Sequence, residues 1–125
     1  MRDFSLARTL IGAIGALGGA AGVAFSALAA HAGGEGLATA AHFLLVHAPL
    51  FVALALTRPP GGALLAAWGI LVGLALFSGD LLARHYLGNR LFPMAAPTGG
   101  FLMIAGWAGL AVMVLLAPRD RVVGP

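Results

Sequence analysis

The fold is decided near the amino terminus by residues 6–30, which read LARTLIGAIGALGGAAGVAFSALAA and contain a single charged side chain, Arg8. About 20 apolar residues in a helix span a hydrocarbon core roughly 30 Å thick, and a helix closes its backbone hydrogen bonds within the segment. We therefore predict a transmembrane helix here. The alternative is a secretory signal with a cleavage site at Ala27-Leu28-Ala29.

Three further segments have the length and composition of membrane spans, namely residues 37–57, 62–83 and 92–117. The connections between spans are short and rich in turn-forming residues, such as Arg-Pro-Pro-Gly at 58–61. Short connections place successive helices antiparallel to each other. The sequence thus predicts an all-α integral membrane protein, with a single transmembrane domain over residues 1–125 folded as an up-down four-helix bundle.

The composition excludes a water-soluble fold. Hydrophobic residues make up 61% of the chain and charged residues 9%, whereas soluble domains carry roughly 25% charged residues. The basic residues stand singly at the ends of apolar runs and form no patch, so membrane lipids are the expected partner and nucleic acid is not. The absence of cysteine removes thiolate and disulfide chemistry.

The positions of the arginines predict the orientation, because short cytoplasmic loops carry the excess of positive charge. A four-span arrangement places most of the arginines on the side of the two termini. Those on that side are Arg2, Arg8, Arg58, Arg119 and Arg121, and those on the other side are Arg84 and Arg90. Both termini are therefore expected to be cytoplasmic.

Glycines recur every three or four residues in the first span and so form a helix face without side chains. Such small-xxx-small patterns let transmembrane helices approach each other closely. We interpret this face as packing within the bundle, with a homodimer face as the alternative. A pair of glycines in the third span is predicted to pack against small residues of the fourth. The predicted packing residues are Gly12, Gly15, Gly19, Gly22, Gly69 and Gly73.

Ionisable side chains within a span are costly, by about 2.5 to 3.5 kcal/mol at the helix centre, and are therefore candidates for function. In this chain they lie, with nearby hydroxyl groups, in the half of the bilayer away from the termini. If these side chains turn inward, they form a polar pocket that opens to that side. The candidates for lining the pocket are His42, His47, Ser78, Asp80 and Thr98.

Structural interpretations compete with the pocket. Asp80 and Arg84 are four residues apart, so an ion pair along one helix is expected. His42 and His47 are five residues apart and lie on different helix faces, so they cannot form a two-histidine metal ligand set from one turn. We therefore expect no metal and no other cofactor.

His47 is the most informative of these residues because it lies about ten residues, or roughly 15 Å, into its span. An unpaired imidazole at that depth is expensive. We expect its ring to face the bundle interior and to form a hydrogen bond with another helix, Ser78 being the first candidate. Pro49 removes a backbone donor and frees a nearby carbonyl, which is the alternative acceptor.

Several short stretches occur in an order and spacing that resemble a known family. They are GVAFSALAAH at residues 22–31, His47-Ala48, LFSG at 76–79, PTGG at 97–100, and Gly106-Trp107. Together they resemble the domain-of-unknown-function 423 family, which includes transmembrane protein 256 and the YwdK-like proteins. The resemblance covers most of the chain.

The resemblance implies a small four-span membrane protein, located in bacteria in the inner membrane, and it implies no particular activity. The chain departs from the family pattern at two positions. Val46 stands where the family has a tyrosine just before the histidine, and Asp80 stands where the family has a small or hydroxyl residue. Any role that depends on that tyrosine does not carry over to this chain.

The function we expect is association in the membrane without catalysis, as an accessory or assembly subunit of a larger complex or as a self-associating bundle. The sequence contains no phosphate-binding loop, no nucleophile beside a base and no acidic pair, so we expect no catalytic residues. One alternative is a small transporter or ion-conducting oligomer, although the first span lacks the carboxylate that small multidrug exporters use. Another is a lipid or quinone site around His47.

Overall fold

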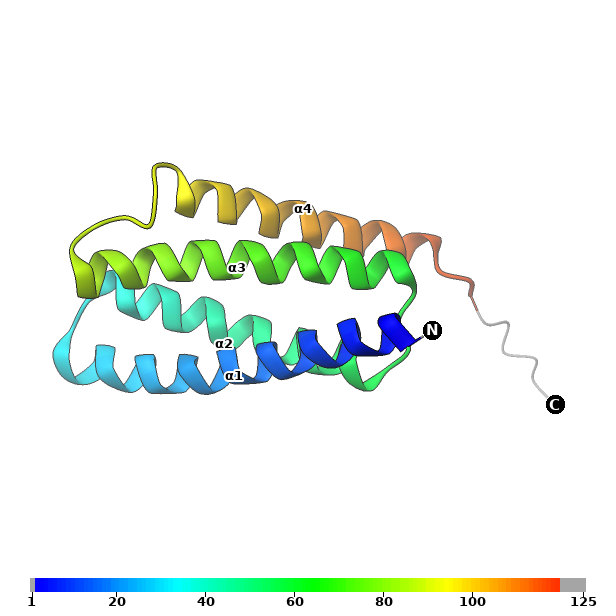
Figure 1. Cartoon of the computed structure of the whole chain (residues 1–125), viewed down its shortest axis with the longest axis horizontal. Helices are drawn as coiled ribbons and strands as arrows, with labels where there is room; N and C mark the ends of the chain where they lie inside the picture. Colours follow the sequence, from blue (N-terminus) through cyan, green and yellow to red (C-terminus); the bar gives the residue numbers. More distant parts are fainter. Residues whose placement is uncertain (1, 120–125) are drawn as a thin grey trace.

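The computed structural model describes residues 2–119, and this part of the chain forms four helices. The helices are α1 (Arg2–Ala32), α2 (Glu35–Leu56), α3 (Gly61–Leu87) and α4 (Ala95–Leu116). Each is long and apolar enough to cross a membrane. Successive helices run in opposite directions, so the protein is an up-down antiparallel bundle, as the sequence predicts (Figure 1).

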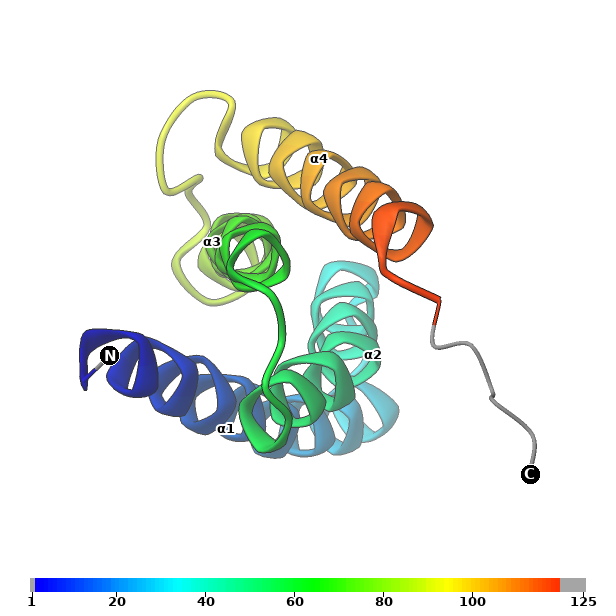
Figure 2. The ribbon, with the colours of Figure 1, turned by 90° about the vertical axis from the view of Figure 1, so that its right-hand side faces the viewer.

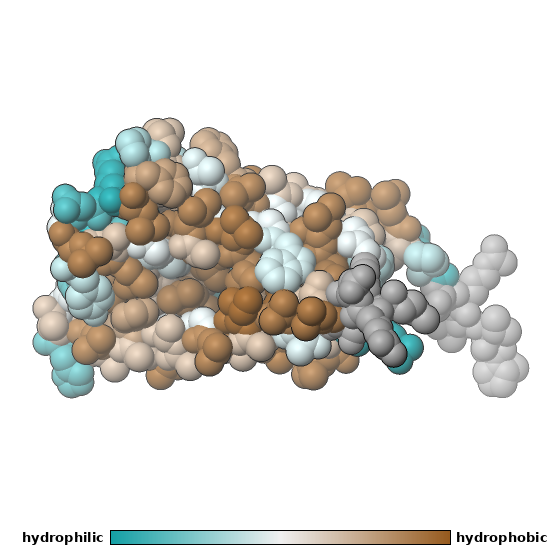
Figure 3. Space-filling view, viewed as in Figure 1, coloured by the Kyte–Doolittle hydropathy of each residue, from teal (hydrophilic) through white to brown (hydrophobic). Residues whose placement is uncertain are grey.

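The two ends of the bundle are more polar than its middle. The start of α1, the α2–α3 connection and the end of α4 lie at one end, which we call the terminal end, and the α1–α2 and α3–α4 connections lie at the other, the loop end (Figure 1). A broad apolar belt separates the polar residues of the two ends (Figure 3). This distribution is that of an integral membrane protein. Of the arginines used to predict orientation, Arg121 lies outside the described residues.

The observed helix ends differ from the predicted span ends mainly around the α3–α4 connection. α3 continues to Leu87, where Gly88 ends it in the left-handed conformation with φ 73°. The extra turn is basic, which suits a helix carboxyl end. α4 begins at Ala95 rather than at residue 92, because Met94 takes a left-handed φ of 69° just after Pro93 and the helix starts only beyond it.

The four helices form two hairpins that meet through α2 and α3. α1 packs along α2, α3 packs along α4, a smaller contact joins α2 to α3, and a minor one joins α1 to α3. The α4 backbone makes no close contact with α1 or α2 in the described part of the chain (Figure 2). The buried core is apolar and centres on Ile11, Phe51, Ile70, Leu74 and Met103. α4 is therefore the helix with the fewest neighbours.

The seam between α1 and α2 contains four of the predicted packing glycines. A Cβ atom on Gly19 would lie 2.9 Å from the Cβ of Ala48, and one on Gly22 would lie 3.1 Å from a carbonyl oxygen of α2. Gly12 and Gly15 face Ala55 and Phe51 even more closely. The glycine face of α1 is thus covered by α2 of the same chain.

The seam between α3 and α4 closes at Gly73 and Gly99, where a Cβ atom on either residue would lie 2.5 Å from the carbonyl oxygen of the other. Gly69 does not pack as predicted, because nothing lies within 4 Å of its Cβ position. The α3 face that meets α4 follows Ala66, Ile70 and Gly73, and Gly69 falls at the edge of that face.

Candidate functional site

The His47 ring is buried and makes two hydrogen bonds. Its Nδ1 lies 2.7 Å from the carbonyl oxygen of Phe43, one turn earlier in α2. Trp107 of α4 donates its Nε1–H to Nε2 of His47 at 3.1 Å. A carbonyl only accepts and an indole N–H only donates, so Nδ1 carries the proton and Nε2 carries none. The geometry therefore fixes a neutral imidazole with both nitrogens occupied.

The predicted partner of His47 was wrong, since Trp107 takes the place expected for Ser78. Phe77, not Ser78, is the α3 residue that meets this turn of α2, with its ring centroid 4.6 Å from that of Phe43. The freed carbonyl near Pro49 is not the acceptor either, because a proline at 49 releases the carbonyl of residue 45. The signal for Trp107 was its position inside a span, since an indole N–H at membrane depth has no water to bond and needs an acceptor from the protein.

Ser78 is buried, with 2% of its surface exposed. Its hydroxyl oxygen has no hydrogen-bond partner within the described residues. This side chain lies in the interior as predicted, but it joins neither His47 nor any other polar group. The Ser78 hydroxyl is therefore an isolated polar group in an apolar core rather than part of a polar network.

Asp80 is fully buried near the loop end of α3, and both of its carboxylate oxygens are engaged. Oδ2 accepts from Nη2 of Arg84 at 2.6 Å, which is the ion pair expected from the spacing of four residues. Oδ1 accepts from the backbone N–H of Leu91 at 2.9 Å. The second bond was not predicted, and it fastens the α3–α4 connection to the end of α3.

His42 and Thr98 do not turn inward. Both side chains are exposed on the outside of the bundle, which in this protein is the side that faces lipid or the membrane interface. The His42 ring contacts the Phe43 ring edge-on. The five candidate residues therefore occupy separate places and do not form the single polar pocket that the sequence predicted.

Two adjacent cavities lie along α4, and the inner one reaches His47 on α2. The inner cavity has a volume of about 290 Å³ and is lined by His47, Phe43 and Trp107, among others. The outer groove, of about 530 Å³, runs between α3 and α4 towards Arg84. The two share Phe77, Gly100 and Ile104 as lining residues and are therefore neighbours, and we call them together the Arg84 groove.

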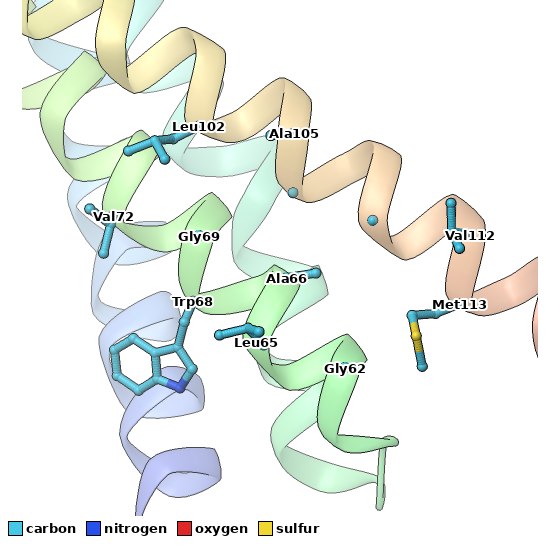
Figure 4. A pocket seen from close by; sticks show the side chains of 12 residues that line it. Gly62, Leu65, Ala66, Trp68, Gly69, Val72, Leu102, Ala105, Val112 and Met113 are labelled. Carbon is cyan, nitrogen blue, oxygen red and sulfur yellow. The ribbon is translucent and has the colours of Figure 1, made fainter.

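A second groove, of about 750 Å³, lies between α3 and α4 nearer the terminal end. Its lining includes Gly69, Gly106 and Gly109. Trp68 and Gly69 of α3 and Met113 of α4 are seen in Figure 4. We call it the Gly69 groove. Every residue that lines it is apolar or glycine.

Among residues 2–119, no three His, Asp or Glu side chains gather as a metal ligand set. The polar side-chain atoms that line the inner cavity are already engaged, since the one donor of Trp107 bonds His47 Nε2 and His47 Nδ1 bonds the Phe43 carbonyl. A ligand carbonyl would therefore have to displace Trp107 to reach the imidazole. The remaining surface around the inner cavity that a ligand could contact is apolar.

These features define a class of protein, a small four-span membrane bundle with open apolar grooves along one hairpin. The chain belongs to the DUF423 family, described as a protein of unknown function, which it matches over residues 11–100. No curated protein and no solved structure matches the chain. The matched region includes His47, Ser78 and Asp80 and ends before Trp107.

Proposed function

We propose that the protein acts by associating with a transmembrane helix of another membrane protein, as a non-enzymatic accessory or assembly subunit in the bacterial inner membrane. The observation that carries this proposal is that the backbone of α4 packs closely against α3 alone in the described residues, and that the Gly69 groove between these two helices is open. Such a groove is an incomplete helix-packing surface.

The lining of the Gly69 groove supports a helix as its occupant. Hydrophobicity alone gives no net attraction between helices in lipid, so association relies on close packing over small residues. Gly69 has no atom within 4 Å of its Cβ position, and Gly109 has one side chain at 3.4 Å. The backbone of a partner helix can therefore approach these two glycines closely. The flanking Leu65 is 75% exposed and is available for contact.

The polar groups of the membrane interior support a non-catalytic role. His47 is engaged by Trp107, and Asp80 is engaged by Arg84 and a backbone N–H. Groups committed in this way hold helices and connections together. They are not poised for proton transfer or nucleophilic attack, which require access to a substrate.

We place the terminal end in the cytoplasm, because it carries more arginines in short segments than the loop end does. Single cysteines at exposed positions test this orientation. An impermeant thiol reagent applied to intact cells should label Asn89→Cys and spare Gly61→Cys. The reverse labelling would place the termini outside.

The association itself is tested with the full-length protein and a photocrosslinking side chain at Leu65, beside the groove, or at Leu17, which is 71% exposed on α1. We expect a discrete crosslinked species from Leu65 and none from Leu17. Mass spectrometry then separates a foreign partner from a second copy of this chain. Equal, diffuse crosslinking from both positions would contradict the proposal.

A matched pair of variants assigns the contact to the groove. Gly69→Leu fills the Gly69 groove, and Gly100→Leu fills the Arg84 groove, and both positions have free space around the Cβ. The crosslinked species should be lost with Gly69→Leu and retained with Gly100→Leu. Retention with both variants would show that the partner binds elsewhere.

A further inference from the structure

We propose that the Arg84 groove binds one anionic phospholipid, with its phosphate at Arg84 and one acyl chain lying along α4 as far as Trp107. This site is distinct from the Gly69 groove and does not depend on the proposed association. The argument rests on the shape of the groove, the charge at its mouth and the chemistry of its inner end.

The groove has the shape of a slot for an acyl chain. It begins at the loop end between Arg84 and Pro97 and continues through Phe77 and Gly100 into the inner cavity beside Trp107. Residues 96–107 cover about 16 Å along the helix axis, a length suited to a hydrocarbon chain. Phe101 is 70% exposed on the rim, so the slot opens sideways to lipid.

The mouth of the groove carries the positive charge. The Arg84 side chain is 39% exposed although its Nη2 is bonded to Asp80. A guanidinium has five N–H donors in a fork that suits phosphate. Within the described residues, Arg84 makes no hydrogen bond other than the one to Asp80. The remaining donors are therefore free for an anion.

The surroundings of Arg84 add to this charge. Arg90 is exposed in the adjoining α3–α4 connection, and the one acidic residue between 36 and 119 is Asp80, which is fully buried and paired with Arg84. The amino end of α4, which carries positive partial charge, also lies at the mouth and has no side-chain cap. The mouth is thus electrostatically complementary to a lipid phosphate.

The inner end of the groove excludes a polar ligand. Both ring nitrogens of His47 and the single indole donor of Trp107 are occupied. An occupant therefore finds no free hydrogen-bond donor there, and its deep end must be apolar. A molecule with an anion at one end and a hydrocarbon chain at the other satisfies both ends of the groove, and a phospholipid of the surrounding leaflet is such a molecule.

Trp107 is a built-in reporter of acyl-chain occupancy. In the full-length Trp68→Phe protein it is the only tryptophan. This protein is reconstituted into phosphatidylcholine vesicles that contain a small, fixed fraction of lipid with brominated acyl chains, as either phosphatidylglycerol or phosphatidylcholine. Bromine quenches tryptophan fluorescence only at short range. We expect brominated phosphatidylglycerol to quench Trp107 several-fold more effectively than brominated phosphatidylcholine.

Variants assign the effect to the groove and to its mouth. Gly100→Leu should abolish the preference by filling the slot, whereas Gly69→Leu, an equally open glycine in the other groove, should leave it intact. Replacing the pair together, as Asp80→Asn with Arg84→Gln, removes the phosphate contact without leaving a buried charge unpaired. This double variant should reduce quenching by phosphatidylglycerol to the phosphatidylcholine level while its circular dichroism remains helical.

Three results would overturn the proposal. Equal quenching by the two brominated lipids would show ordinary annular lipid only. An unchanged preference in Gly100→Leu would place the lipid outside the groove. Relief of quenching by inorganic phosphate would assign the anion site to free phosphate rather than to a lipid. None of these results bears on crosslinking at Leu65, so the two proposals fail separately.

Discussion

The seam between α1 and α2 and the seam between α3 and α4 use glycine in different ways. In the first seam, glycines such as Gly15 are met by side chains of α2. In the second, Gly73 and Gly99 admit a close crossing, while Gly69 and Gly100 have empty space around them. A glycine in a membrane helix thus either brings two helices of the chain together or leaves a hollow for something outside the chain, and its neighbours decide which.

The largest effect is expected in the first seam. Gly15→Leu combined with Gly19→Leu would drive side chains into Phe51 and Ala48, and overpacking of this kind should destabilise the fold by at least about 3 kcal/mol. We expect loss of monodisperse protein in size-exclusion chromatography. Gly18→Leu is the control, because the nearest atom to its Cβ position is a Leu44 methyl at 3.7 Å. A stable double variant of reduced oligomeric mass would make this seam an oligomer face.

In the seam between α3 and α4, substitution of glycine should destabilise the fold only where the two helices cross, at Gly73 and Gly99. Gly73→Ala places a methyl group 2.5 Å from the Gly99 carbonyl oxygen, and it should lower the free energy of unfolding by about 1 to 3 kcal/mol. Gly69→Ala has no atom to displace and should be neutral or stabilising by up to about 1 kcal/mol. Chemical denaturation in detergent measures both. Equal destabilisation by the two variants would remove the distinction between packed and open glycines.

A buried carboxylate also secures the second hairpin, whereas the Arg8 hydrogen bond to the Thr57 carbonyl in the first hairpin is exposed. Asp80→Asn should cost about 2 kcal/mol, because the hydrogen bonds of Arg84 and of the Leu91 amide lose their charged acceptor. Amide hydrogen exchange at Leu91 should accelerate. The Gly33 amide, which bonds to the Ala29 carbonyl at the same end, should exchange as before. Unchanged exchange at Leu91 would show that Asp80 does not hold the connection.

The smallest expected effect concerns the tie between the two hairpins. His47→Leu and Trp107→Phe should be non-additive in thermal stability, with a coupling of about 0.6 to 1.7 kcal/mol, the range for interhelical hydrogen bonds in membranes. His47→Leu with Ser78→Ala is the control pair and should be additive, because the Ser78 hydroxyl has no partner. Coupling in the control pair, or its absence between His47 and Trp107, would contradict the hydrogen-bonding pattern.

The sequence could predict what depends on a single helix. Span length and composition predict four helices, a repeat of three and four residues predicts the glycine face of α1, and the spacing of Asp80 and Arg84 predicts their ion pair. Each of these follows from helix geometry alone. They are the parts of the fold and of the candidate site that agree with the structure.

What the sequence could not predict depends on how helices are placed around each other. The contact between His47 and Trp107 joins residues 60 positions apart, and it bridges α2 and α4, whose backbones make no close contact. His42 points outward because α2 presents a different face to α3 than the pocket hypothesis assumed. Gly69 is the residue directly before Ile70 and falls beside the α3 face that packs against α4. The rotation of a helix about its own axis is set by the helices that pack against it. A pattern within the sequence of that helix therefore does not predict this rotation.

The attachment of α4 through one neighbour has a mechanical consequence. Regions with few packed contacts open at lower free energy than the rest of a protein and do so as cooperative units. α4 shares its long seam with α3 alone, and one side-chain hydrogen bond connects it to α2 in the described residues. If the protein is pulled from its carboxyl end, α4 should peel away first at low force, leaving α1, α2 and α3 to rupture together in a later and stronger event.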